Sequence, residues 1–184
     1  MLVAYASKHG STAGIAESIA ETIRKRGAHV DVRPIGDIGD IGDIGELDSY
    51  EAFVIGSAVY YGFWRREARR FVKRHSALLA SRPVWLFSSG PLGTKTTDPQ
   101  GRDLLSVAEP KVIAKFTSAI APRGHRVFFG ALDLSKLGAA ERVVTKLLAR
   151  QDLVSEGDFR DQVDICAWAT GIAQALDATQ AAAH

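Results

Sequence analysis

The first 27 residues constrain the fold most strongly, because they join a buried strand, a polar loop and an amphipathic helix without a gap. Residues 2–6, LVAYA, are apolar throughout, which is typical of a strand covered on both faces. After residue 12, apolar residues recur at helical spacing on one side and charged residues lie on the other, until Gly27 ends the helix. The chain therefore begins with a strand–loop–helix unit.

The loop of this unit is the hexapeptide Ser7-Lys8-His9-Gly10-Ser11-Thr12, which contains three hydroxyl side chains. The first turn of a helix leaves backbone N–H groups unpaired, and the helix dipole favours a negative charge there. The loop is thus predicted to hold a phosphate, and the alternative is a turn that only caps the helix. A P-loop is excluded because no lysine follows Gly10, and the dinucleotide pattern G-x-G-x-x-G is absent from this turn.

Strand and helix patterns alternate along the rest of the chain. Further strands are predicted at residues 30–34, 53–57, 83–88 and 125–131. Helices are predicted at 64–79 and 110–120, around 143–148, and from 157 onwards. Pro34 suits an edge strand, so strand 30–34 is placed outermost. The alternation predicts an α/β sheet wound on both faces with right-handed crossovers.

Composition and charge bound the class of protein. The 184 residues are 46% hydrophobic and 24% charged, which suits one domain over residues 1–178 with a frayed tail at 179–184. A net charge of +2 does not indicate nucleic-acid binding, and no apolar run reaches the ~18 residues of a membrane span. Cys166 is the one cysteine, so neither an internal disulfide nor a cysteine metal cluster is expected, and a cytoplasmic location is predicted.

Residues 36–45 repeat Gly-Asp-Ile three times. The period is too short for a solenoid and the glycine content too high for a helix, so the repeat is predicted to be a loop. A calcium loop is the alternative, but the spaced bidentate glutamate of such loops is missing. No metal site is therefore predicted.

The predicted helix 64–79 has a strongly basic outer side. A single acid, Glu67, accompanies six cations: Arg65, Arg66, Arg69, Arg70, Lys73 and Arg74. The inner stripe begins with Trp64, and His75 is expected at its rim. Solvated surface charge is the simplest interpretation of such a helix.

Two more loops rich in serine, glycine and aromatic residues follow predicted strands. They are Ser57-Ala58-Val59-Tyr60-Tyr61-Gly62 and Ser88-Ser89-Gly90-Pro91-Leu92-Gly93. In a doubly wound sheet, ligands bind beyond the carboxyl ends of the strands where the strand order reverses. The three loops are therefore predicted to form one binding site.

The first loop resembles the phosphate-binding fingerprint of flavodoxins. The matching residues are Tyr5, Ser7, Gly10, Thr12, Ala16 and Ile19, while Ala4 is smaller than the family's usual residue. The resemblance implies a flavodoxin-like three-layer α/β/α sandwich, a five-stranded parallel sheet of order 2-1-3-4-5, and FMN as the cofactor.

The resemblance also implies the residues that bind FMN. Ser7, Lys8, His9, Gly10, Ser11 and Thr12 would surround the phosphate, with Lys8 and His9 at the loop tip. Ser57, Ala58, Val59, Tyr60, Tyr61 and Gly62 would lie beside the flavin ring, and Ser88, Ser89, Gly90 and Gly93 at its edge. Tyr60 or Tyr61 would stack on the ring, and Gly62 would let its carbonyl approach N5. Ala58 and Val59 replace the family's usual proline and threonine, and no catalytic residue is identified.

Longer stretches resemble one branch of the superfamily, the menaquinone-dependent protoporphyrinogen IX dehydrogenases. They are residues 67–75, Phe129-Gly130-Ala131-Leu132, the predicted helix after it, Gly157-Asp158-Phe159-Arg160 and Ala167-Trp168-Ala169. Loop 88–93 departs from the enterobacterial form of this branch. The branch implies an enzyme that passes electrons from a large organic substrate to a quinone.

Two other functions stand beside this one. A flavodoxin could carry electrons between redox proteins without acting on a substrate. A flavin-free receiver-like module is disfavoured, because strand 53–57 ends without a phosphorylatable aspartate. If the chain is the enzyme, cations of helix 64–79 would raise the flavin potential and hold porphyrin propionates. Arg142, Lys146 and Arg150 would then contact anionic lipid at the inner face of the membrane.

Overall fold

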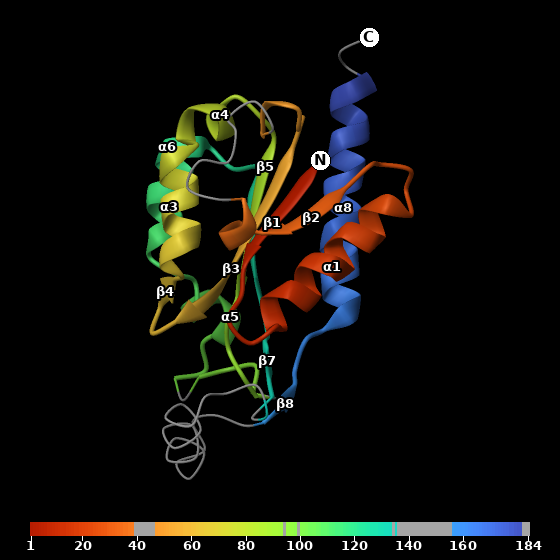
Figure 1. The fold of residues 1–184 in the computed structure, drawn as a ribbon. Coiled ribbons are helices and arrows are strands. Elements are labelled where there is room, and N and C mark those ends of the chain that lie inside the picture. The colour runs from red at the N-terminus through yellow and green to blue at the C-terminus, as the bar shows by residue number, and fades with distance from the viewer. Residues whose placement is uncertain (39–46, 94, 99, 134, 136–155, 182–184) are drawn as a thin grey trace.

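Five parallel strands form the centre of the molecule, in the order β2-β1-β3-β5-β6 (Figure 1). Their bounds are β1 Leu2–Ala6, β2 Asp31–Pro34, β3 Phe53–Tyr60, β5 Val84–Ser89 and β6 Gly124–Phe128. The computed structural model describes residues 1–38, 47–93, 95–98, 100–133, 135 and 156–181. Counted along the chain, these parallel strands have the order 2-1-3-4-5, which confirms the predicted flavodoxin-like sheet and its outermost second strand.

Helices cover both faces of the sheet (Figure 1). One face carries α1 Ser11–Arg24 and α8 Gln162–Ala181, and the other carries α3 Arg66–Arg74, α4 Ser76–Ala80 and α6 Val112–Ile120. The short elements are η1 Ile35–Asp37, β4 Phe63–Trp64, α5 Leu104–Val107, β7 Ala131–Leu132 and β8 Gly157–Asp158. No helix among the described residues is both long enough and apolar enough to cross a membrane.

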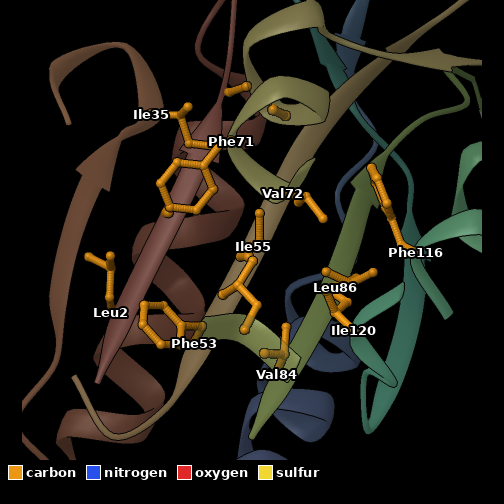
Figure 2. Close-up of a cluster of buried hydrophobic side chains, with 14 of the residues drawn as sticks. Leu2, Ile35, Phe53, Ile55, Phe71, Val72, Val84, Leu86, Phe116 and Ile120 are labelled. Atoms are coloured by element: carbon orange, nitrogen blue, oxygen red, sulfur yellow. The ribbon is translucent and has the colours of Figure 1, made fainter. Parts of the chain in front are cut away.

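The central strands are apolar because both of their faces are covered. Residues of β1 alternate between two buried clusters: Leu2 and Ala4 pack toward α3 and α6, and Val3 packs toward α1 and α8. Figure 2 shows the first cluster, where Phe53 and Ile55 of β3 point toward the same layer as Phe116 of α6. A continuous apolar run is the pattern that such a doubly covered strand requires.

The predicted helix 64–79 is wrong at its start and is interrupted in the middle. Trp64 lies in β4, which pairs antiparallel with the end of β3, and α3 begins only at Arg66. His75 separates α3 from α4 with φ −100° and ψ 20°. Its side chain is also buried, against Phe71 at a ring-centroid distance of 4.8 Å, so the expected rim position is wrong.

Two further boundaries differ from the sequence prediction. The segment 125–131 is not one strand, because β6 ends at Phe128 and β7 pairs with β8 instead. Gly157 and Asp158 form β8, and the last helix begins at Gln162 and continues to Ala181. The predicted helix around 143–148 and most of the Gly-Asp-Ile repeat lie outside the described residues.

Gly56 allows β3 and β5 to pack closely, and we predict that adding one methyl group there disrupts the core. A Cβ atom at Gly56 would lie 2.0 Å from Cζ of Phe87, a fully buried ring with no room to move. Gly56→Ala should therefore lower the free energy of unfolding in urea by about 1–3 kcal/mol or more.

Gly171→Ala is the matched control for this change. Gly171 lies inside α8, and a Cβ atom there meets no atom within 4 Å. The control should stabilise the protein by about 0.5–1 kcal/mol, since alanine is the better helix former. Equal effects of the two substitutions would contradict the packing at Gly56.

Candidate functional site

The loop between β1 and α1 presents unpaired donors at the carboxyl edge of the sheet. Gly10 takes a left-handed conformation with φ 89°, and its N–H donates to Ser7 Oγ at 3.1 Å. The intrahelical ladder starts with the bond from Gly14 N–H to Gly10 O, at 3.0 Å. The N–H groups before Gly14 have no carbonyl one turn behind them, so they can bind an anion.

Thr12 has a polar atom with no partner in the protein. Its side chain is 0% exposed, and Oγ1 has no hydrogen-bond partner, the one such buried side-chain atom within the described part of the chain. Leaving a buried hydroxyl unpaired costs about 1–3 kcal/mol. A ligand oxygen at the loop would remove this cost, so the residues present fit a bound phosphate.

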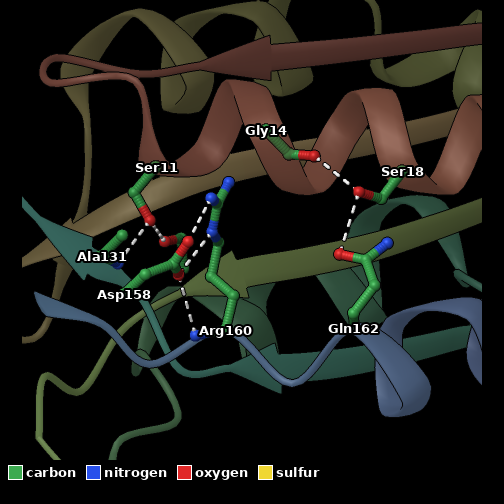
Figure 3. Close-up of polar contacts among 8 residues, drawn as sticks. Ser11, Gly14, Ser18, Ala131, Asp158, Arg160 and Gln162 are labelled. Atoms are coloured by element: carbon green, nitrogen blue, oxygen red, sulfur yellow. Dashed lines mark hydrogen bonds and ion pairs between the residues drawn. The ribbon is translucent and has the colours of Figure 1, made fainter.

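Ser11 connects the first loop to two other loops (Figure 3). Its Oγ accepts a hydrogen bond from Ala131 N–H at 2.8 Å and lies 3.1 Å from Ser89 Oγ. Gly130 has little space beside it, because a Cβ atom there would lie 3.4 Å from both Ser11 Oγ and Gly90 O. The structure thus brings loop 7–12, the end of β5 and residues 130–131 together, as the topology predicted for the first two.

Residues 57–62 form the first part of a β-hairpin rather than a loop. Tyr61 and Gly62 occupy the turn with φ values of 51° and 79°, and Tyr60 pairs with Phe63 on either side. Positive φ at both central residues is the geometry of two-residue hairpin turns of the I′ class, which glycine favours and tyrosine rarely adopts. We name residues 59–64 the aromatic hairpin.

The tip of the aromatic hairpin exposes its rings. Tyr60 is 40% exposed, Tyr61 90% and Phe63 55%, whereas Trp64 at the base is buried. Neighbouring exposed aromatic side chains often mark an interaction site, so the exposed surfaces of these rings could contact a flat ligand or a partner. Ala58 and Val59, also predicted at the site, are half-buried at the base of the hairpin.

Two of the predicted serines are occupied by protein groups. Ser57 Oγ accepts from Arg65 N–H at 3.0 Å and donates to Ala58 O at 2.9 Å. Ser88 Oγ accepts from Trp64 Nε1 at 2.7 Å and lies 2.9 Å from His125 Nε2. Both serine side chains are 0% exposed, so in the structure they hold the aromatic hairpin on the sheet.

Backbone hydrogen bonds join the rest of loop 88–93 to the end of β6 and to the residues after it. Gly90 N–H donates to Phe128 O at 3.0 Å, and Gly130 N–H donates to Pro91 O at 2.9 Å. Gly93 has a φ angle of 113°, a backbone conformation that residues other than glycine rarely adopt. Lys8 and His9 complete the predicted set, exposed and half-buried respectively at the tip of the first loop.

Sequence reasoning missed an ion pair beside the first loop (Figure 3). Arg160 Nε donates to Asp158 Oδ1 at 2.8 Å, and these bonds hold the pKa of Asp158 below its ordinary value. Arg160 Nη1 lies so close to α1 that a Cβ atom at Gly14 would be 1.9 Å away. Glycine at position 14 therefore admits the guanidinium group, which no local pattern indicates. No cluster of metal-binding side chains occurs among the residues that the structure describes.

Thr12→Val separates ligand binding from folding, because valine keeps the shape of threonine without the hydroxyl. The free protein should gain up to about 1 kcal/mol of stability in urea unfolding, since a buried unpaired group is removed. Affinity for the expected FMN should fall about 5- to 150-fold, because phosphate oxygens lose a donor. The affinity is measured by quenching of flavin fluorescence.

Thr22→Val serves as the control on the same helix, where the hydroxyl donates to Ser18 O at 2.8 Å. This change should lower stability and leave FMN affinity unchanged. Unaltered affinity in the Thr12 variant would contradict the placement of the phosphate.

Comparison with known proteins agrees with this geometry. The family model described as "Flavodoxin domain" matches residues 2–155. Protoporphyrinogen IX dehydrogenase (quinone) of Escherichia coli strain K12 is 25% identical over 167 residues, which cover 91% of this chain and 87% of that protein.

Solved structures share the fold. Oxidised flavodoxin 2 from Bacillus cereus superposes with a TM-score of 0.52 at 21% identity, over 82% of this chain and 97% of that one. Rubredoxin oxygen:oxidoreductase of Desulfovibrio gigas superposes with a TM-score of 0.64 at 16% identity, over 98% of this chain but 36% of that longer chain. The chain therefore belongs to the flavodoxin domain family of flavoprotein oxidoreductases, and its cofactor is FMN.

Proposed function

We propose that this protein is an FMN-dependent dehydrogenase of the protoporphyrinogen IX type that delivers electrons to a quinone. The Escherichia coli protoporphyrinogen IX dehydrogenase (quinone) matches 91% of the chain, which includes the aromatic hairpin and α3. The structural observation that carries the proposal is the charge next to the hairpin, on the outer side of α3.

Four cations on α3 have no acidic partner among the described residues: Arg66, Arg69, Arg70 and Lys73. All four are exposed, whereas Arg65 pairs with Glu67 and is held by that carboxylate. The helix begins at Arg66, two residues after Trp64, which is the last residue of the aromatic hairpin. These cations are thus placed to attract a substrate that carries carboxylates, and to favour the anionic reduced form of a flavin at the hairpin.

The proposed FMN site uses the three loops in different roles. Ser7, Gly10, Ser11 and Thr12 hold the phosphate through hydroxyl and backbone N–H groups, with Lys8 and His9 at the entrance. Tyr60 or Tyr61 would stack on the flavin ring, the Gly62 carbonyl would be available to its N5, and Ser89, Gly90 and Gly93 would border the ring edge. When bound, FMN supplies the two-electron chemistry, while the protein residues orient it and exclude water from one side.

The second candidate is a flavodoxin that carries electrons between proteins, and the fold alone favours it equally. The exposed cations argue for the enzyme, because a low-potential carrier benefits from acidic groups that disfavour reduction. Contact with anionic lipid through Arg142, Lys146 and Arg150 remains part of the proposal, and these residues lie outside the described part of the chain. Such a contact would bring the cytoplasmic enzyme to its quinone.

Replacement of the hairpin tyrosines tests the ring position. Tyr60→Ala or Tyr61→Ala should weaken FMN binding by about fivefold, because a stacked aromatic ring contributes about 1 kcal/mol beyond burial. Tyr61 is 90% exposed in the free protein, so its variant should keep the native unfolding curve. Phe63→Ala is the control on the same hairpin; if both tyrosine variants bind FMN as tightly as this control, the ring lies elsewhere.

Removal of the α3 charges distinguishes the enzyme from the carrier. Arg66, Arg69 and Arg70 changed together to Gln should lower the flavin potential, and a loss of about 1.4 kcal/mol corresponds to roughly 60 mV for one electron. Turnover of porphyrinogen with a quinone should fall in parallel, which spectroelectrochemistry and a porphyrin fluorescence assay measure.

In the matched control, three exposed cations that precede β2 and β5, at the edge of the sheet where the strands begin, are changed to Gln: Lys25, Arg26 and Arg82. This control should change neither the flavin potential nor the turnover beyond the small effect of distant charge. A native protein with a strongly negative potential and no turnover, insensitive to the α3 changes, would decide for the electron carrier.

A further inference from the structure

A chain of four side chains connects the base of the aromatic hairpin to solvent across three strands. Trp64 Nε1 donates to Ser88 Oγ at 2.7 Å, Ser88 Oγ lies 2.9 Å from His125 Nε2, and His125 Nδ1 lies 2.8 Å from Glu109 Oε1. Ser88 is 0% exposed and the His125 side chain 8%, whereas the Glu109 side chain is 54% exposed. The chain therefore begins beneath the hairpin and ends at the surface.

The direction of every hydrogen bond in this chain follows from the chemistry of its ends. An indole can only donate, and an ionised carboxylate can only accept. Ser88 Oγ thus accepts from Trp64 and donates its own O–H to His125 Nε2, while His125 Nδ1–H donates to Glu109. Each donor has an acceptor only when His125 is neutral with its proton on Nδ1.

Protonation of His125 breaks this arrangement. Nε2 then becomes a donor, and Ser88 Oγ, which already accepts from Trp64, has to accept from His125 as well and can no longer donate to it. The serine O–H has then lost its acceptor in a site that is 0% exposed, and it must rotate toward another one. That rotation also turns the lone pairs of Ser88 Oγ away from Trp64 Nε1, so the bond to Trp64 is distorted or the hairpin base moves. The bond from Arg65 N–H to Ser57 Oγ, which also holds the base of the hairpin, is independent of His125.

We propose that Trp64, Ser88, His125 and Glu109 form a positioning relay, which holds the aromatic hairpin in place only while His125 is neutral. The relay therefore makes the affinity of the protein for the flavin ring depend on pH. This inference rests on the proposed ring site at Tyr60 and Tyr61, and His125 acts through Trp64 rather than by touching the flavin.

The surroundings of His125 leave Glu109 as its controlling charge. Burial lowers the pKa of His125 from its ordinary value of 6.5, and the hydrogen bond and charge of Glu109 act in the opposite direction. Charged groups on the neighbouring elements are engaged elsewhere or exposed: Asp103 with Ser106, Arg126 with Asp164, and Lys111 and Lys115 on the outer side of α6. Since the folded pKa is lowered, the folded state loses stability as pH falls through the unfolded value of 6.5 toward the folded one.

The test compares FMN affinity at pH 7.5 and 5.0 in the native protein and in Trp64→Phe. The phosphate of FMN itself titrates near pH 6, so the ratio between the two proteins is the informative quantity. Native protein should bind FMN about fivefold more tightly than Trp64→Phe at the higher pH, the effect of one hydrogen bond, and about equally at the lower pH. A ratio that is the same at both pH values would overturn the relay.

Glu109→Gln tests the assignment to His125, and its exposed position should leave folding intact. The amide can still accept from Nδ1–H but no longer favours a protonated ring, so the pH at which affinity falls should move down. His75→Gln removes the other buried histidine, whose pKa is lowered by burial and by Arg74, and should leave that pH unchanged. If the pH at which FMN affinity falls does not move in Glu109→Gln, or moves equally in His75→Gln, the relay is contradicted.

A second readout needs no flavin. In the free protein, the indole N–H resonance of Trp64 should titrate with a midpoint below 6.5 and shift with Glu109→Gln; a resonance insensitive to pH would overturn the relay. Failure to bind FMN at any pH, with this resonance titrating as expected, would instead count against the cofactor assignment.

Discussion

The organisation of the site depends on hydrogen bonds that the protein leaves unmade at the start of α1. The left-handed turn at Gly10 directs the first N–H groups of the helix outward, and the buried hydroxyl of Thr12 has no partner among the described residues. Unpaired donors are costly, so the fold retains them where a ligand can satisfy them. The neighbouring contacts serve to hold this turn in position, because Ser11 is joined to Ala131 and Ser89.

The proposed flavin site combines a rigid phosphate end with an adaptable ring end. The phosphate end rests on α1, whose apolar face is packed against β1 and α8, and Arg160 lies against the helix at Gly14. The ring end is a two-residue hairpin with exposed tyrosines, attached through buried polar bonds at its base. Low-stability elements of this kind are where binding and control are usually found. A pH-dependent anchor at the base of the hairpin therefore changes ring contacts without disturbing the phosphate.

The charge on α3 separates the two functions that the fold permits. Flavodoxin-like domains share a sheet order and a phosphate loop whatever they do with electrons, so those features carry no information about the substrate. In the proposed enzyme, the four exposed cations of α3 that have no acidic partner among the described residues would act on both the reduction potential and the binding of an anionic substrate. Substitution of exposed surface charges changes the free energy of unfolding only slightly. Variants of α3 therefore report on function rather than on folding.

Local patterns in the sequence determined the strand–loop–helix unit, with its polar loop, and the buried strands, because each depends on residues that are close along the chain. The edge position of β2 followed from one proline in the same way. The sequence also placed Thr12 at the site, but it could not show that its hydroxyl has no partner in the free protein.

Only the tertiary structure decided which distant groups meet. The turn at Tyr61 carries no asparagine–glycine signature, so the local pattern predicts a loop there and a helix that starts at Trp64, whereas the structure has a hairpin. Ser11 meets Ala131 across 120 residues, and Ser88 meets His125 across 37. Serine and histidine pair with whatever packing brings within reach, and packing depends on the whole sheet rather than on neighbours in sequence. The sequence alone therefore determined the loop between β1 and α1, whereas the contacts that anchor the hairpin could be found only in the folded structure.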